Sequence, residues 1–374
     1  MLLSINLVLT ALAIICGILM IWQVAPPLKE VKDKKNSAAL ANQLSIIIPA
    51  RNEEFRIPEL LASLKAQDIK PLEIIVMDDH SDDKTAEIAS LTGARVITSE
   101  TENDWVGKSA ACWDGALQAR GKWLLFLDAD TKLGSPGGLR QIIASYAELS
   151  GSGILSFQPY HRVKNIYESF SAIFNIIVVA GMNVFTPWRE KFTSAGAFGP
   201  CIICNKEEYF AIGGHKAISE AIMDDLALGE LFQQHGYQVK NYVGQHIISL
   251  RMYPEGFRQL FEGWTKSFGT AYQSTHPFVF SLILIWISGS FSTITLIMLA
   301  VLSSSLLWII IAGLASLIYA LVFIFQARRL GNFKLFLLAL YPLHVLFFLV
   351  LFSWSLFLTK VLRTVSWRGR KIKV

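Results

Sequence analysis

Two long apolar blocks, one at each end of the chain, constrain its fold more than any other feature. The first covers residues 1–27 without a single charge, and the second covers 278–360. A helix needs about 20 consecutive apolar residues to cross a bilayer, and residues 2–24 meet that length. Only 17% of the residues are charged, whereas soluble domains usually carry about 25%. We therefore expect a multi-pass protein of the cell membrane.

The first block is expected to be an N-terminal transmembrane anchor, residues 1–27, that is not cleaved. A signal peptide would begin with basic residues and end at small residues, whereas this block is uncharged and ends in Pro26-Pro27. Lysines follow between residues 28 and 35, so the positive-inside rule places the next part of the chain in the cytoplasm.

The second block breaks into three apolar stretches, at 279–302, 306–326 and 333–359. Three crossings would put the basic tail, residues 361–374, outside the cell, against the positive-inside rule. One stretch is therefore expected to be re-entrant or interfacial. The stretch that contains Pro342 is the candidate, and the sequence leaves this point open.

Between the blocks, residues 28–277 are expected to form one cytosolic α/β domain. Continuous apolar runs, typical of strands buried on both faces, cover 44–50, 73–79 and 122–130. Helical patterns between them cover 57–67, 83–92 and 108–119. This alternation predicts a mostly parallel sheet with flanking helices.

Polar residues follow each of these strands, at the edge where parallel sheets bind their ligands. The residues at these strand ends are Pro49, Ala50, Arg51, Glu53, Asp78, Asp79, Asp128 and Asp130. Several carboxylates in one crevice repel each other unless a cation or a donor-rich ligand sits among them. Mg or Mn, which prefer oxygen ligands, would suit Asp130. A solvated turn is the alternative, since Asp is common where strands stop.

Two common nucleotide-binding motifs are missing from the sequence. No GxGxxG follows the first strand, and no GxxxxGK[ST] occurs anywhere. Phosphates would instead be held by the metal, by Arg51 and by Lys108, for which solvation at a helix flank is the alternative. The net charge is only +5, and the basic residues cluster beside the apolar blocks, which favours a lipid bilayer over nucleic acid as a partner.

The segment Cys201-Ile202-Ile203-Cys204 has CxxC spacing. No second pair of Cys or His residues completes a zinc set, and a cytosolic location argues against a disulfide. We expect buried, inert thiols in a strand.

Four segments, in this order and spacing, resemble the inverting family 2 glycosyltransferases with the GT-A fold: IIIPARNEE, IIVMDDHSDDKTAEIA, GKSAACWDGA and FLDAD. The second half, with AFGPCIICNKEEYFAIGGH and RMYPEGFRQLFEGWTKSFGT, is similar to the 4,4'-diaponeurosporenoate glycosyltransferases. The resemblance covers nearly the whole chain. It implies transfer of glucose from UDP-glucose to the carboxylate of a lipophilic carotenoid acid, 4,4'-diaponeurosporenoate, to form a glucosyl ester.

The same resemblance implies roles on the donor side. The residues that would line the donor pocket are Pro49, Ala50, Arg51 and Glu53. One of Asp78 or Asp79 would accept a hydrogen bond from the uracil ring. Asp128 would face the ribose or the uracil, and Asp130 would hold a divalent metal that bridges the diphosphate.

On the acceptor side, the resemblance implies that Gly213-Gly214-His215 forms a loop in which the glycines let the backbone approach the sugar. Asp224 and Asp225 occupy the place of the family's acidic pair at a helix start. An alcohol acceptor would need a general base, and Asp225 is the candidate. A carboxylic acid is already ionised at neutral pH, so Asp225 would then only position the acceptor or a hydrogen-bond donor in the acceptor loop.

Two positions depart from the family pattern. Trp264 falls where many relatives have the Trp of a QxxRW motif, but Glu262 and Gly263 precede it, so the full motif is absent. His80 replaces the Gly that usually follows the two acids.

Two helical segments are also ambiguous. Residues 166–185 are expected to form an interfacial helix that admits a lipophilic acceptor, with a core helix as the alternative. The aromatic stripe that ends at Trp264 either packs or roofs the site.

Several functions remain open from sequence. The acceptor could be another membrane lipid, such as ceramide, hopanoid or diacylglycerol. A catalytically inactive nucleotide or lipid carrier, a polysaccharide synthase and a nucleotidyltransferase are further alternatives.

Overall fold

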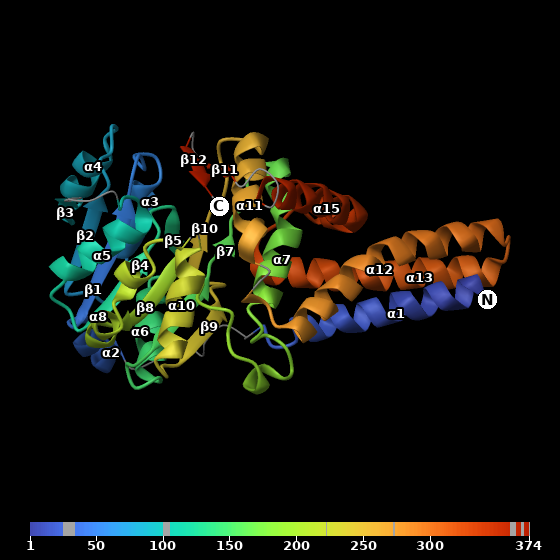
Figure 1. The fold of residues 1–374 in the computed structure, drawn as a ribbon, viewed down its shortest axis with the longest axis horizontal. Coiled ribbons are helices and arrows are strands. Elements are labelled where there is room, and N and C mark those ends of the chain that lie inside the picture. The colour runs from blue at the N-terminus through green and yellow to red at the C-terminus, as the bar shows by residue number, and fades with distance from the viewer. Residues whose placement is uncertain are drawn as a thin grey trace. The chain divides into compact units, whose positions relative to one another are not determined.

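The computed structural model describes residues 1–24, 34–99, 105–221, 223–271, 274–359, 364–367 and 370–373, with the backbone alone for 266–271 and beyond 363. The chain folds as two compact units (Figure 1). Unit 1 consists of Met1–Val24, His161–Thr193 and Met252–Val374, and unit 2 consists of Ala25–Tyr160 and Ser194–Arg251.

Unit 2 contains a seven-stranded sheet. Its strands are β1 (Leu44–Ala50), β2 (Glu73–Asp78), β3 (Arg95–Thr98), β4 (Trp123–Leu127), β6 (Ile154–Gln158), β8 (Cys201–Asn205) and β9 (Val239–Val243). Their order is β3-β2-β1-β4-β8-β6-β9, and of these seven only β8 runs antiparallel to its neighbours. The predicted mostly parallel sheet is thus confirmed. Two short strands, β5 (Thr131–Leu133) and β10 (Ile248–Leu250), pair antiparallel, and β7 covers Tyr160–His161.

Helices cover both faces of this sheet. They are α2 (Lys34–Ala41), α3 (Ile57–Lys65), α4 (Thr85–Leu91), α5 (Lys108–Gln118), α6 (Gly138–Ala147), α8 (Lys206–Ala211), α9 (Gly214–Ala217) and α10 (Asp224–Gln234). Successive strand residues bury into opposite cores: Ile46 packs in the cluster with α3 and α6, and Ile47 in the cluster with α5 and α10. This two-sided burial explains why β1 is apolar at nearly every position.

Unit 1 is helical. Its elements are α1 (Leu2–Met20), η1 (Ile166–Phe170), α7 (Ser171–Gly181), η2 (Arg189–Lys191), α11 (Phe257–Ala271), α12 (Pro277–Leu302), α13 (Leu306–Leu330), α14 (Leu335–Ala339), α15 (Tyr341–Phe357) and the hairpin β11 (Thr364–Trp367)–β12 (Arg370–Lys373). Among the described residues, α1, α12 and α13 are long and apolar enough to span a membrane. Lys29, Lys32, Arg363 and Arg368, on which the topology prediction partly rests, lie outside the described residues.

These three long helices run side by side (Figure 1) and pack through small residues. A Cβ on Gly289 would lie 2.2 Å from the Cβ of Ala13, and a Cβ on Gly17 would lie 2.5 Å from the Trp286 ring. The Gln326 side chain donates a hydrogen bond of 2.6 Å to the carbonyl of Gly17. Close backbone approach with a few polar contacts is the usual packing of apolar helices in lipid.

The third C-terminal stretch is broken. α14 ends at Ala339, and α15 begins at Tyr341 with Pro342 in its first turn. α15 has 17 residues, fewer than a straight crossing requires. A re-entrant or interfacial course for this stretch stays a prediction.

The segment expected to form a helix over 166–185 is a 3-10 turn, η1, followed by α7 over 171–181. Most residues of α7 are buried, and Phe174 contacts Trp264 of α11 and Phe348 of α15. In unit 1 α7 is therefore surrounded by other helices, as the core-helix alternative describes. Its placement at a membrane interface stays a prediction.

Candidate active site

Three parallel strands of unit 2 bring their polar ends to one edge of the sheet. In the β1–β2 ladder, Ala50 lies opposite Asp78, and β4 pairs with the other side of β1. From β1 the chain adds β2 and then β3 on one side, and it returns to add β4 on the other side of β1, so the strand order switches between β1 and β4. Open α/β sheets bind ligands in the crevice at such a switch point.

The end of β1 and the end of β2 are joined by an ion pair and by a backbone hydrogen bond. Arg51 lies 3.5 Å from the carboxylate of Asp79, and the N–H of Asp79 donates to the carbonyl of Ala50. Asp79 is buried, while Arg51 remains partly exposed. The Asp78 carboxylate accepts from the N–H of Ser81 at 3.3 Å. Arg51 is thus held at the crevice by a buried acid.

The loop after β1 is fastened to the loop after β2 by hydrogen bonds. The N–H of Glu53 donates to the hydroxyl of Thr85, and the N–H of Asp82 donates to the Asn52 side chain. Asn52 has a positive φ of 54°, a conformation that Asn adopts more readily than most residues. The Glu53 carboxylate is bound by Arg56 at 2.9 Å. Arg56 and Thr85 are site residues that the sequence did not single out.

Lys108 stands between two carboxylates that come from distant parts of the chain. Its ammonium lies 2.9 Å from Asp128, after β4, and 3.3 Å from Asp225, in the first turn of α10. Lys108 itself is the first residue of α5. Its side chain is 33% exposed, so a ligand in the crevice can reach it. Lys108 is thus paired with two acids at the start of its helix, and its role in holding phosphates stays a prediction.

Burial and the charges of this cluster shift the pKa values of Lys108 and Asp225. Burial alone would lower the pKa of Lys108, but Asp128, Asp225 and Asp224 raise it well above its usual value. The pKa of Asp225 is raised to about 7, first by burial and then by Asp224, against the lowering effect of Lys108. Lys108 is therefore a fixed cation, and Asp225 titrates near neutral pH.

Asp130 lies in acidic surroundings. Its pKa is raised to about 7, first by burial and then by the carboxylates of Asp128 and Glu53. Arg56 and Lys108 act in the opposite direction without cancelling this rise. Such an excess of negative charge fits a bound divalent cation, which would favour the ionised form of Asp130.

A metal at Asp130 would need ligands from outside the protein. In the part of the chain that the structure describes, no three His, Cys, Asp or Glu side chains are placed to hold a metal ion by themselves. Magnesium typically binds through one or two carboxylates together with water and substrate phosphates. The residues present fit that pattern, in which the ion arrives with its phosphorylated ligand.

The predicted acceptor-side loop, Gly213-Gly214-His215, lies at the start of α9. Gly213 and Gly214 have positive φ values, and a Cβ on Gly214 would lie 2.4 Å from the ring of Tyr209. Gly214 thus allows a close approach to Tyr209, and an approach of this loop to a sugar stays a prediction. His215 is buried, its ring bonds to the Tyr209 hydroxyl at 2.8 Å, and burial lowers its pKa to about 4. The carbonyl of His215 accepts from Ser109 of α5, beside Lys108.

Trp264, the other acceptor-side candidate, belongs to unit 1, whereas the candidates above belong to unit 2. It is buried in α11, its ring nitrogen donates to the hydroxyl of Ser171 at 3.0 Å, and it stacks on Phe174 at 4.8 Å. These contacts describe a packing residue. An acceptor role for Trp264 stays a prediction.

The CxxC cysteines lie in β8 and are buried and unpaired with each other. Burial raises the pKa of both thiols, which favours the protonated, unreactive form. The prediction of buried thiols in a strand is confirmed, and their inertness stays a prediction.

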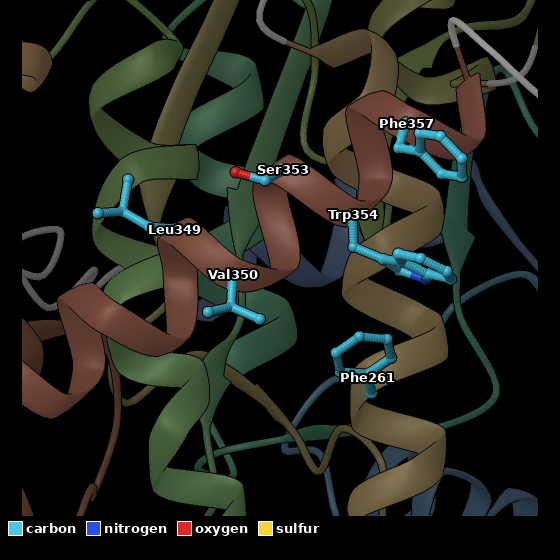
Figure 2. Close-up of a pocket in the computed structure, with 6 residues that line it drawn as sticks. All are labelled: Phe261, Leu349, Val350, Ser353, Trp354 and Phe357. Carbon is cyan, nitrogen blue, oxygen red and sulfur yellow. The ribbon is translucent and has the colours of Figure 1, made fainter.

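A pocket of about 570 Å³ lies between α11 and α15 in unit 1 (Figure 2). Its lining residues are Phe261, Leu349, Val350, Ser353, Trp354 and Phe357. Trp354 and Phe357 stack with their ring centres 5.7 Å apart. Figure 2 shows Phe261 of α11 and Trp354 of α15 reaching toward the same space. The lining is almost wholly apolar, which suits a hydrocarbon ligand.

Comparison with known proteins places this site in a family. The sequence family described as glycosyl transferase family 2 matches residues 45–161, which include the ends of β1, β2 and β4. The 4,4'-diaponeurosporenoate glycosyltransferase of Staphylococcus aureus strain USA300 is 39% identical over 333 residues, 88% of this chain and 88% of that protein. The enzyme of strain MRSA252 is 38% identical over the same shares.

A solved structure shares the fold. The mannosyltransferase PcManGT from Pyrobaculum calidifontis, in complex with GDP-Man and Mn2+, aligns with a TM-score of 0.53 over 95% of this chain and 99% of its own, at 17% sequence identity. The chain therefore belongs to glycosyl transferase family 2 and is a glycosyltransferase of the GT-A fold.

Proposed function

We propose that the enzyme transfers glucose from UDP-glucose to the carboxylate of a C30 carotenoid acid, 4,4'-diaponeurosporenoate, with inversion at the anomeric carbon. The observation that carries this proposal is the 39% identity, over 88% of both chains, to proteins named for that acceptor. In the reaction a carboxylate oxygen bonds to the anomeric carbon while the bond to the diphosphate breaks. The products are a glucosyl ester and UDP.

On the donor side, different residues at the strand ends contact different parts of the nucleotide. Pro49 and Ala50 line the base pocket, and the buried acids Asp78 and Asp79 offer an acceptor to the uracil N–H. Arg51, held by Asp79 at 3.5 Å, presents its guanidinium to the diphosphate.

Lys108 and Asp130 serve the departing diphosphate. Lys108 keeps its charge at any physiological pH because three carboxylates raise its pKa, so it supplies a permanent cation beside the leaving group. Mg or Mn on Asp130, when bound, would stabilise the same negative charge as a Lewis acid. Asp128 is 26% exposed and paired with Lys108, and faces the ribose or the uracil.

The acceptor is lipophilic. The apolar pocket of unit 1 supports a site for its hydrocarbon chain, since stacked aromatic rings and aliphatic side chains line it (Figure 2). The apolar helices α1, α12 and α13 support a membrane location. We assign unit 2 to the cytoplasmic side, because Lys34 and Lys35 follow the first apolar block.

A second acceptor class is favoured by one observation. The pKa of Asp225, about 7, is that of a group poised to accept a proton near neutral pH. A hydroxyl acceptor on another membrane lipid, such as ceramide, a hopanoid or diacylglycerol, needs such a base. An ionised carboxylate acceptor does not, and Asp225 would then position it.

The test is UDP release by the detergent-purified protein with UDP-glucose and Mg or Mn, supplied in parallel with 4,4'-diaponeurosporenoate or ceramide. Turnover with the carotenoid acid and a product that mild alkali hydrolyses would support the glucosyl ester. Turnover with ceramide alone would move the function to the second class. Pyrophosphate in place of UDP would indicate a nucleotidyltransferase, a ladder of products a polysaccharide synthase, and no turnover with either lipid would contradict both acceptor proposals.

A further inference from the structure

Gly199 lies where any side chain would collide with the carboxylate of Asp225. A Cβ on Gly199 would lie 1.7 Å from Oδ2 of Asp225 and 2.1 Å from its Cγ, far closer than atoms that are not bonded can approach. The other carboxylate oxygen, Oδ1, lies 3.3 Å from the ammonium of Lys108. The carboxylate of Asp225 is therefore held between the bare backbone of Gly199 and the lysine.

The neighbouring residue, Pro200, holds the other acid that Lys108 contacts. The N–H of Asp128 donates to the carbonyl of Pro200 at 3.1 Å. The turn that precedes β8 thus contacts both acids that flank Lys108. The carbonyl of Pro200 bonds to the backbone of Asp128, and the backbone of Gly199, which has no Cβ, leaves room for the carboxylate of Asp225.

Two other glycines fix the backbone of α10 against the same turn. Gly196 has a φ of +146°, and a Cβ there would lie 2.5 Å from the Cα of Leu226. A Cβ on Gly229 would lie 2.5 Å from the carbonyl carbon of Gly196. Because these contacts are between backbones, α10 cannot shift without disturbing the turn. A methyl group at position 199 would therefore be accommodated by displacement of the Asp225 side chain, away from its contact with Lys108.

We propose that Gly199 is a positioning residue for Asp225: its missing side chain keeps the carboxylate against Lys108 and aimed into the crevice. The inference rests on the proposed participation of Asp225 in glucosyl transfer. The proposal gives Gly199 a different role from Gly196 and Gly229. The close contacts of these two glycines are to the backbone, so they serve only the packing of the fold.

The test compares Gly199→Ala with Gly229→Ala, each in the wild type and in an Asp225→Ala background. Asp225→Ala removes the three atoms nearest to the methyl group that Gly199→Ala adds, so it relieves the collision at 199 and leaves the one at 229. The readouts are kcat and KM for UDP-glucose and the apparent unfolding temperature.

We expect Gly199→Ala to lower kcat by about 100-fold, the loss that a misplacement of about 1 Å in an active site can cause. KM for UDP-glucose and the unfolding temperature should stay near the wild-type values. In the Asp225→Ala background the same substitution should cause no further loss. Gly229→Ala should lower the unfolding temperature equally in both backgrounds.

Three outcomes would overturn the proposal. One is a folded Gly199→Ala enzyme with kcat within about threefold of the wild type, far short of the displacement effect. Another is a loss of stability or folding at position 199 that Asp225→Ala does not relieve, which would make Gly199 a packing residue. The last is an active Asp225→Ala enzyme, which would refute the role of Asp225 itself. If Asp225→Ala is inactive while Gly199→Ala is active, the role of Asp225 stands and only the positioning proposal fails.

Discussion

The polar residues of the two units do different work. In unit 1 the polar contacts between helices are made by neutral groups: Thr10 bonds to Ser292, and Gln326 to the backbone of Gly17. In unit 2 charged groups meet at the sheet edge, and the pKa values of Asp130 and Asp225 are raised there, first by burial and then by neighbouring carboxylates. The neutral paired groups of unit 1 stabilise helix packing, whereas the excess of negative charge at the sheet edge of unit 2 is typical of a ligand-binding site.

The largest test of this difference is Asp130→Ala in unit 2. We expect transfer to fall about 1,000-fold, because the site loses the carboxylate assigned to the metal, and metal stabilisation of the leaving group is worth several kcal/mol. The measurement is UDP release at saturating Mg or Mn. Removal of the metal with EDTA should reduce wild-type turnover to a similar level and should barely affect the variant.

The matched control for this substitution is Glu87→Ala, which removes an exposed carboxylate from α4. It should keep turnover near that of the wild type. Equal turnover of Asp130→Ala and the control would show that the carboxylate of Asp130 is not needed for catalysis.

The second test uses pH. The pKa of Asp225 is about 7 in the folded protein and near 4 when unfolded. Between these values the folded protein binds more protons at this site than the unfolded chain does. Ionisation of Asp225 therefore lowers stability as pH rises from about 4 to 7, by up to about 1.4 kcal/mol per pH unit.

Asp225→Asn removes this dependence. The variant should gain in unfolding temperature relative to the wild type as pH is raised from 5 to 7, and the gain should level off above that range. His215, whose pKa is lowered to about 4, has the opposite dependence, but it is present in both proteins and cancels from the difference. Both proteins are measured without metal or nucleotide. A difference that does not change with pH would contradict a raised pKa.

The third test addresses unit 1 and its close helix contacts. Gly289→Ala would place a methyl group 2.2 Å from the Cβ of Ala13, so α1 and α12 must separate. We expect a loss of about 1–3 kcal/mol, typical of overpacking. Gly313→Ala in α13 is the matched control, since nothing lies within 4 Å of its Cβ position. Unfolding of both variants in detergent gives the comparison, and equal stabilities would argue against tight packing of α1 on α12.

The fold was largely predictable because its signals are local. β1 covers the predicted 44–50, and α5 covers 108–118 against a predicted 108–119. The antiparallel direction of β8 was not predicted, because strand direction depends on partners that are distant in the sequence. The position of the helix break before Tyr341 was not predicted either, because a single proline only marks a possible break.

The site was predictable only in part, for the same reason. Arg51 stands directly after β1, and Asp130 lies in the turn that follows β4, so their placement at one edge follows from the parallel order. The contact between Lys108 and Asp225 joins residues 117 positions apart, and no local pattern encodes it. Gly199 gives no signal of its own, since its importance depends on the carboxylate that lies against it.

The smallest test asks whether Trp264 belongs with the packing residues of unit 1. Trp264→Phe removes the hydrogen bond to Ser171 but keeps an aromatic ring to stack on Phe174. The expected loss of stability is about 1 kcal/mol, the usual net value of one hydrogen bond, with no change in turnover. Ser171→Ala removes the same bond from the other side and should have a similar effect on the unfolding temperature. If Trp264→Phe alone lost turnover while Ser171→Ala kept it, the indole would have a role in the reaction that its packing does not explain. The contrast between neutral packing contacts in unit 1 and charged groups in unit 2 would then fail at that residue.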